Sequence, residues 1–236
     1  MKKTALALIV LTAVAAPLRA QKISNVDFDA IRRAVSDTGS AYFYPRLWKR
    51  FLRFDTTLDR RAYAHLYYGH VYQGDYNPVN TELIEREREF LECDKAKKRA
   101  KAAAAARALV DTDPLNLKYN HYAGMSLLRK GDTVSARRYR GRWTSLINLI
   151  LASGDGRSDS TAYVVIRVPD EYQVMGHLGL EPTAHFFRGG PAGKRLYRDV
   201  FELKPNKIGF DKIYFNTNWS YWYLNRAIEG ETQGAK

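Results

Sequence analysis

The chain has 236 residues but only one cysteine, Cys93, and no motif that identifies a metal or catalytic site. A single thiol cannot close an intramolecular disulfide, so packing must hold the fold together. Cys93 is then either a buried, unreactive thiol or the site of an intermolecular disulfide. The absence of His-Glu-x-x-His, Gly-x-Ser-x-Gly and Gly-x-x-x-x-Gly-Lys patterns predicts no metal, no cofactor and no familiar nucleophile. A catalytic Ser/His/Asp set assembled only in space stays open.

Long apolar runs are also missing, except at the N-terminus. Lys2 and Lys3 precede an apolar run at residues 5–16, and small residues come just before Gln21. This pattern is typical of a secretory signal peptide at residues 1–20, because the run is too short to span a bilayer. We expect no transmembrane segment in the mature protein, since no other stretch approaches ~18 apolar residues. The sequence therefore predicts export to the periplasm or the extracellular space.

Charge is strongly biased toward basic residues. Lys and Arg number 38 against 25 Asp and Glu, which gives a formal net charge of +13 at pH 7. A basic surface attracts anions in general, and export makes nucleic acid an unsuitable partner. The remaining candidates are an acidic glycan, an acidic envelope lipid or an acidic protein partner. The alternative is a basic surface that only faces solvent.

The mature chain up to residue 153 has the apolar spacing of helices. Turn-forming clusters at residues 36–40 and 74–78 interrupt that spacing. Whether the charged and alanine-rich stretch before Asp113 forms one helix or two joined near Cys93 is left open. The predicted helices lie near residues 27–35, 44–54, 58–72 and 81–112.

Residues 113–142 show a more specific helical pattern. The small pair Ala123–Gly124 falls where two helices would cross closely, and Gly131–Asp132 marks a turn between them. This segment resembles a tetratricopeptide repeat, a helix–turn–helix unit of about 34 residues. We expect one clear unit and one degenerate unit before it, whose first helix would lie at Tyr63–Gln73.

The pattern changes after Ser153 to short β-branched or alternating runs. A short helix begins at Pro169 and ends near Gly179, and predicted strands lie at residues 162–168, 183–188, 196–203 and 212–217. The prediction is an α+β fold in which tetratricopeptide-like antiparallel helix pairs pack on a small, mainly antiparallel sheet. The corresponding regions are a helical one at 21–153 and an α+β one at 154–236, which ends in a polar tail.

Candidate ligand-binding residues come from four stretches. One is the loop around Asp155, whose acids and glycines suggest either a calcium-like loop or a glycine-rich turn. An aromatic cluster suggests either a platform for sugars or proline-rich peptides, or a packing stripe. Adjacent carboxylates suggest either an acid–base pair or stabilising charge at a helix N-terminus. The arginines of residues 137–142 suggest either a binding site for phosphate or carboxylate groups, or a helix face that is exposed to solvent. The candidates are Tyr67, Tyr68, Gln73, Tyr76, Asp155, Asp170, Glu171, Tyr172, Arg137 and Arg138.

Several short motifs follow one another along the chain in a recognisable order. They run from Tyr67-Tyr68-Gly69 through Tyr76-Asn77-Pro78 and Ser153-Gly154-Asp155-Gly156 to Asp170-Glu171-Tyr172. In this order the chain resembles an uncharacterised domain-of-unknown-function family of secreted Gram-negative bacterial envelope proteins. The resemblance implies secretion but no activity. It also implies that the family shares Tyr68, Gly69, Gln73, Tyr76, Asp155 and Tyr172.

The sequence favours a non-enzymatic binding or scaffold protein over an enzyme. Stacked helix pairs form grooves, so the leading hypothesis is a protein or peptide partner bound by the helical face. A second hypothesis is a glycan-active hydrolase, which requires two carboxylates about 5–10 Å apart across a cleft. A third is electrostatic binding of acidic lipid or glycan through residues 129–142.

Overall fold

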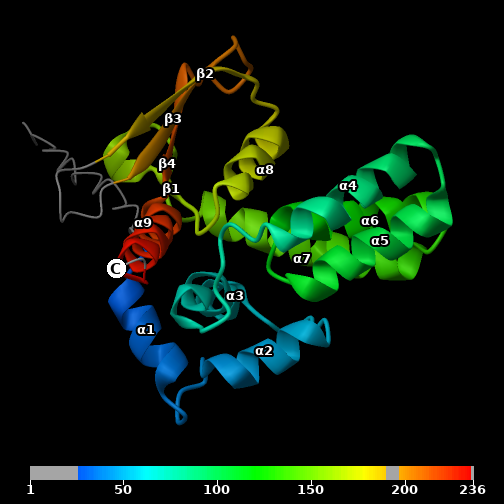
Figure 1. The fold of residues 1–236 in the computed structure, drawn as a ribbon, viewed down its shortest axis with the longest axis horizontal. Coiled ribbons are helices and arrows are strands. Elements are labelled where there is room, and N and C mark those ends of the chain that lie inside the picture. Colours follow the sequence, from blue (N-terminus) through cyan, green and yellow to red (C-terminus); the bar gives the residue numbers. More distant parts are fainter. Residues whose placement is uncertain (1–25, 190–196, 235–236) are drawn as a thin grey trace, which may run out of the picture.

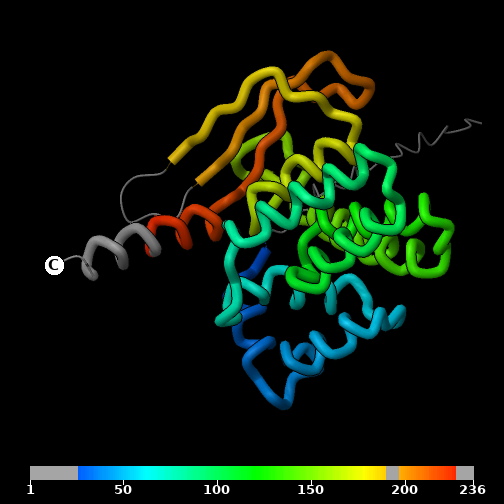
Figure 2. The backbone as a smooth tube through the Cα atoms, turned by 45° about the vertical axis from the view of Figure 1, so that its right-hand side comes forward, coloured from blue at the N-terminus to red at the C-terminus, as the bar shows by residue number. Residues whose placement is uncertain are grey.

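The computed structural model describes residues 26–189 and 197–234, and side chains as far as Arg226. The predicted signal peptide and its cleavage site lie outside these residues. Helices fill most of the chain, and a four-stranded sheet forms from the C-terminal third. Figures 1 and 2 show the sheet and the first two helices at opposite ends of the molecule, with the helical hairpins beside them.

Two of the N-terminal helices, at residues 28–36 and 60–67, begin at side-chain caps. The Asp27 and Asp59 carboxylates accept hydrogen bonds of 2.9 and 2.8 Å from backbone N–H groups in the first turns. Gly69 allows close packing against the first helix, because a Cβ there would lie 2.7 Å from Val35. The elements are α1 (Phe28–Ser36), α2 (Tyr44–Leu52), α3 (Arg60–Tyr67) and the 3₁₀ helix η1 (Tyr68–Tyr72).

Four longer helices pack consecutively as two antiparallel hairpins (Figure 1). The stretch before Asp113 forms two helices, because the chain reverses after Lys95 with Lys97 at φ 56°. The expectation that Tyr63–Gln73 pairs with the alanine-rich helix is wrong. The alanine-rich helix, at residues 99–112, packs instead against the helix at residues 82–95. The four are α4 (Glu82–Lys95), α5 (Arg99–Thr112), α6 (Leu117–Lys130) and α7 (Thr133–Leu151).

The sheet has the strand order β1-β4-β3-β2. β1 and β4 are parallel and the other pairs are antiparallel, which confirms the predicted α+β fold with a mainly antiparallel sheet. The helix α8 (Pro169–Leu178) covers one face, where Tyr172 contacts Phe201. The strands are β1 (Tyr163–Val164), β2 (Pro182–Arg188), β3 (Arg198–Leu203) and β4 (Lys212–Asn216).

The first strand is much shorter than the predicted 162–168. Tyrosine hydroxyl groups form hydrogen bonds with backbone groups that would pair with a neighbouring strand if the strand were longer. Tyr68 and Tyr76 donate to the carbonyl oxygens of Val164 and Ile166, at 3.2 and 2.6 Å. The Tyr67 hydroxyl accepts from the Ile166 N–H at 3.2 Å. The backbone of the buried run is therefore bonded partly by side chains and partly by β4, where the Asn216 carbonyl oxygen accepts from the Val165 N–H.

One large hydrophobic core extends from α1 through α7 to the sheet, and a smaller one lies within α4–α7. Buried alanines of α5 belong to the smaller core, and half-buried Cys93 packs against it. The last helix, α9 (Asn218–Gly234), covers the terminal segment that begins near Trp219 and continues into the polar residues after Ile228. Across the described residues, no helix has the length and apolar character needed to cross a membrane.

Candidate functional site

A surface groove of about 370 Å³ lies between α7 and the connection from α2 to α3. We call it the arginine groove. The wall from the α2–α3 side is mainly aromatic and apolar, and consists of Phe51, Phe54, Leu58 and Tyr63 with Asp55 and Thr56. The wall from α7 consists of Val134, Arg137, Arg138, Gly141, Arg142 and Ser145.

The α7 wall follows directly from helical geometry. Its members recur three or four residues apart, which places them on one side of the helix. In the same helix Tyr139 and Leu146 are buried, while Arg140 is exposed and does not line the groove. The sequence of α7 therefore presents a basic stripe to the groove and an apolar stripe to the core.

Arg142 is the unusual member of this wall. It is only 4% exposed, and its guanidinium carbon lies 4.0 and 3.9 Å from the ring centroids of Phe51 and Phe54. Its Nη2 donates a 2.6 Å hydrogen bond to the Phe51 carbonyl oxygen. Within the described residues it forms no ion pair with a carboxylate. Burial lowers the pKa of Arg142 to about 10, so the group is still protonated at pH 7.

The backbone beside Arg142 is strained. Phe54 adopts φ 56°, a left-handed conformation that a bulky side chain seldom takes. Such conformations cost about 1–3 kcal/mol and cluster at ligand-binding sites. This conformation closes the C-terminal end of α2, where the Asp55 N–H donates to the Arg50 carbonyl oxygen, and it places the Phe54 ring against the buried cation.

Among the described residues that line the groove, no carboxylate pairs with Arg142, although the charge of Asp111 acts on it from outside the groove. Arg137 and Arg138 are exposed on α7. The nearby Asp55 carboxylate already accepts hydrogen bonds from Thr57 and Arg50, which lower its pKa to about 2. Arg50 pairs with it at 2.7 Å. The negative charge of Asp55 is therefore compensated by an arginine of α2 and not by the arginines of α7. The groove therefore attracts anions.

A second cluster of polar groups is buried between the helices and the sheet. Tyr67 donates a 2.6 Å hydrogen bond to Asp170, and Arg167 pairs with Asp113 at 2.9 Å. Burial raises the pKa of Asp170 to about 6, although the Arg167 charge and the Tyr67 hydrogen bond act in the opposite direction. Asp170 has no exposed surface, so its carboxylate joins elements instead of meeting a ligand directly.

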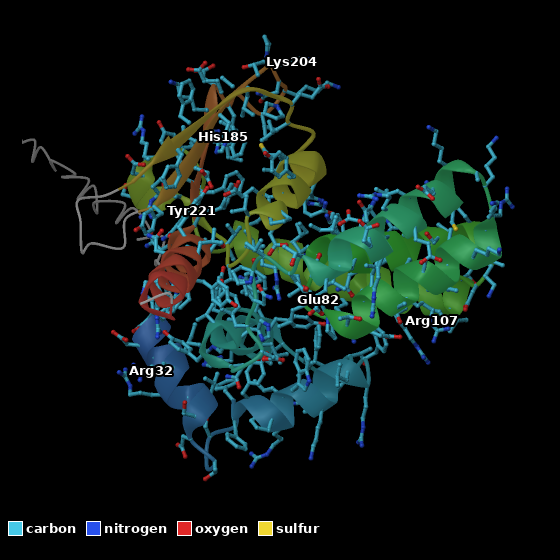
Figure 3. All side chains as sticks on the ribbon, in the orientation of Figure 1. Arg32, Glu82, Arg107, His185, Lys204 and Tyr221 are labelled. Atoms are coloured by element: carbon cyan, nitrogen blue, oxygen red, sulfur yellow. The ribbon has the colours of Figure 1, made fainter. Side chains whose placement is uncertain are left out.

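A third cluster lies under α8. His185 Nε2 is 2.8 Å from Asp199 Oδ1, and Asp199 and Glu171 have no exposed surface. Burial and the Asp199 charge raise the pKa of Glu171 well above its ordinary value. Burial and the same carboxylates raise the pKa of Tyr221 to about 12. Figure 3 shows His185 on the sheet, in β2, and Tyr221 near the start of α9.

The predicted aromatic candidates are mostly interior. Tyr67, Tyr68 and Tyr76 are at most 5% exposed, so they follow the packing alternative and do not form a surface platform. Only Tyr172 is open to solvent, with its ring against Phe201. Gln73 uses its amide to donate to the Gly69 carbonyl oxygen at 3.2 Å.

The predicted carboxylates are also separated. Asp170 and Glu171 lie in the first turn of α8 as expected, but both are buried and they contact different partners. Asp155 forms a local turn, where its carboxylate accepts a 2.9 Å hydrogen bond from the Arg157 N–H. Of the ten candidates, only Arg137 and Arg138 lie in the arginine groove.

Sequence reasoning missed the partners that complete these clusters. Asp113, Arg167, His185 and Asp199 gave no local signal, because each acts with residues distant in the chain. Arg142 carried one usable signal: it lies four residues after Arg138 and therefore on the same helix face. Its burial between two phenylalanine rings could not be read from that spacing.

Comparison with known proteins yields a family but no activity. Residues 29–222 match a family described as Domain of unknown function (DUF4919). No curated protein and no solved structure matches the chain. In the part of the chain that the structure describes, no group of three His, Cys, Asp or Glu side chains is placed to hold a metal ion.

Proposed function

The chain belongs to the DUF4919 family, whose function is unknown, and we propose that it is a binding protein that captures an acidic peptide segment of a partner protein. The binding site is the arginine groove. The observation that carries the proposal is Arg142, a buried and protonated guanidinium without a carboxylate partner among the described residues. A ligand carboxylate supplies the missing counter-charge.

A carboxylate suits this site because of the guanidinium geometry. Nη2 of Arg142 is engaged with the Phe51 carbonyl oxygen, and the two phenylalanine rings hold the group in place. Arginine in such a fixed orientation recognises planar anions through its remaining N–H groups. The fixed orientation also reduces the entropy lost on binding.

The composition of the walls indicates what flanks the carboxylate. Phe51, Phe54 and Leu58 on one side and Val134 on the other offer apolar contact, and Val134 is 66% exposed. A volume of about 370 Å³ falls within the range of pockets that hold small ligands or a few side chains. The best occupant is therefore a short segment in which acidic and apolar residues adjoin.

Gly141 supports the approach of a ligand backbone. It lies in the middle of the 19-residue α7, where glycine costs about 1 kcal/mol relative to alanine. A Cβ at this position would meet nothing within 4 Å, so packing within the protein does not require glycine. A missing side chain in the groove wall lets a bound segment lie directly against the helix.

The predicted hydrolase alternative has less support. Glu171 and Asp199 come from different elements and lie close together, but neither has exposed surface. A glycan requires direct access to both carboxyl groups. Export of the protein, predicted from its N-terminal segment, agrees with a partner in the cell envelope and remains part of the proposal.

Titration with paired peptides tests the function. One peptide carries Asp flanked by Leu and Phe, and its counterpart carries Asn in place of Asp. We expect the acidic peptide to bind and the neutral one to bind at least about tenfold more weakly, because only the former neutralises Arg142. Binding should weaken as salt rises from about 0.05 M to about 0.15 M.

Two charge reversals on α7 form a matched pair. Arg138→Glu changes the groove, whereas Arg140→Glu makes the same charge change on an exposed position outside it. The first should reduce affinity at least about tenfold and the second much less, since distant surface charges are screened. Equal losses, or equal binding of the two peptides, would show that the groove does not recognise a carboxylate.

Gly141→Ala separates binding from folding. The substitution should raise the free energy of unfolding by about 0.5–1 kcal/mol, because alanine favours helix. The same protein should bind the acidic peptide more weakly, because the new methyl group occupies the groove. A variant that is more stable and binds as well as the original protein would contradict the proposed path of the ligand.

A further inference from the structure

A second pocket lies where the helical hairpins meet the segment that leads into α8. Its volume is about 320 Å³. Its wall comes from residues 77–81, the start of α4, residues 113–119 and residues 167–169, together with Ser220. Most of the accessible surface of this wall is apolar. Figure 3 labels Glu82, which marks the start of α4 at the centre of the molecule. We call this the junction pocket.

Arg167 lines the junction pocket and has unused hydrogen-bond donors. The residue is 2% exposed, and only its Nη2 has a partner, Asp113 at 2.9 Å. Its Nε and Nη1 have no hydrogen-bond partner among the described residues. Buried donors of a charged group are costly to leave unpaired, so an acceptor at this position is strongly favoured.

The charges around the pocket are already balanced. Arg167 pairs with Asp113, and Lys118 pairs with Glu87 at 2.7 Å. An additional charge on the ligand would find no free counter-charge on these four residues. This distinguishes the junction pocket from the arginine groove, where Arg142 lacks a carboxylate partner among the described residues.

The mouth of the pocket carries exposed apolar side chains. Val79 is 46% exposed and Ile84 is 54% exposed, and both line the pocket. Behind them Leu83 is buried, and Pro78 and Pro169 complete the apolar wall. Large exposed aliphatic groups beside an open cavity bind apolar matter rather than water.

From these features we infer that the junction pocket binds a small, uncharged, apolar ligand that carries one hydrogen-bond acceptor such as a carbonyl oxygen. The apolar body of the ligand covers Val79 and Ile84, and its acceptor receives an N–H of Arg167. The site does not depend on peptide binding in the arginine groove. The two sites are distinguished by the charge of what they bind.

Three probes of similar shape test this assignment by protein-observed NMR. Acetophenone has the carbonyl acceptor, α-methylstyrene replaces it with a methylene group, and benzoate carries a charge. We expect acetophenone to shift the methyl resonances of Val79 and Leu83 saturably, with about millimolar affinity for a ligand of this size. α-Methylstyrene should bind about tenfold more weakly, because it leaves the Arg167 donors unpaired. Benzoate should not bind better than acetophenone.

Matched variants of α4 locate the site without disturbing the interior. Ile84→Glu places a charge at the mouth of the pocket, whereas Leu91→Glu places one at a 48% exposed position of the same helix outside it. Acetophenone binding should be lost in the first variant and kept in the second. Equal binding of acetophenone and α-methylstyrene, or an unaffected Ile84→Glu variant, would overturn the inference.

Discussion

Tyr67 donates a 2.6 Å hydrogen bond to the carboxylate of Asp170, which lies 103 residues later in the chain. The same hydroxyl accepts from the Ile166 N–H, so one side chain joins α3 to the segment that leads into α8. All three residues have no exposed surface. The contact therefore connects the helical part of the core to the part beneath the sheet.

Tyr67→Phe should lower the free energy of unfolding by about 2–3 kcal/mol near pH 7, because it removes a hydrogen bond to a buried carboxylate. The Tyr67 hydrogen bond lowers the pKa of Asp170, so its loss raises a pKa that already lies above the ordinary value. The folded state then holds the proton more tightly. The loss should shrink toward about pH 4, where Asp170 is increasingly protonated in both states.

Urea unfolding at both pH values measures this effect, and Tyr68→Phe is its control. The Tyr68 hydroxyl bonds to a neutral carbonyl oxygen, so its removal should cost about 1 kcal/mol at either pH. If the two variants lose the same stability with the same pH dependence, the Asp170 carboxylate does not carry the effect.

Glu171→Gln should stabilise the protein at alkaline pH relative to the original chain. The folded-state pKa of Glu171 lies well above 4.5, through burial and the Asp199 charge. Its stabilising contribution is full below the unfolded pKa and is lost as pH rises through the folded pKa. Glutamine does not ionise, so the variant avoids this loss.

Denaturant titrations across the pH range check this, with Glu89→Gln as the control at an exposed position of α4. The stability difference between Glu171→Gln and the original protein should grow with pH, whereas the Glu89 variant should run parallel to it. A constant difference for Glu171→Gln would mean that this carboxyl group does not titrate with folding.

Arg142→Ala should lower the free energy of unfolding by about 2–4 kcal/mol. It empties the space between Phe51 and Phe54 and removes the bond to the Phe51 carbonyl oxygen. Arg142→Met keeps an apolar chain between the rings and removes a costly buried charge, so it should lose less than half as much. Urea unfolding with unchanged m-values gives the comparison. Equal losses would mean that the charge, rather than the packing, stabilises the groove wall.

We propose that the protein is exported and that its mature chain begins at Gln21, because residues 1–20 have the pattern of a signal peptide. Expression in a Gram-negative host, followed by fractionation and intact-mass measurement, tests this. A full-length protein that starts at Met1 and stays in the cytoplasm would contradict the prediction.

Elements with strong periodicity could be predicted from the sequence. The turn at Gly131–Asp132 and the two helices beside it follow from local signals, as does the start of α8 at Pro169. The partner of α5 could not be found in this way. Tertiary packing decides which helices pair. The sequence of α4 is mostly charged and has only a narrow apolar face, which buries only Leu83 and Phe90, so its pairing could not be predicted.

The candidate site was less accessible to sequence reasoning. The β-branched run at 162–168 predicts a strand, but tyrosine hydroxyls from η1 and the loop after it bond its backbone. Asp170 and Glu171 have the pattern of surface charge at a helix N-terminus, yet α3 and the sheet cover them. Contacts between residues that are distant in the chain cannot be predicted from the local spacing of residue types.

The most direct test of the account is the NMR signal of the Arg142 side-chain Nε–Hε group during titration with the acidic peptide. The account predicts that this signal shifts saturably, with the same dissociation constant as the backbone amides along the groove side of α7. A peptide that binds and leaves the Arg142 signal unchanged would contradict the claim that this buried arginine receives the ligand carboxylate.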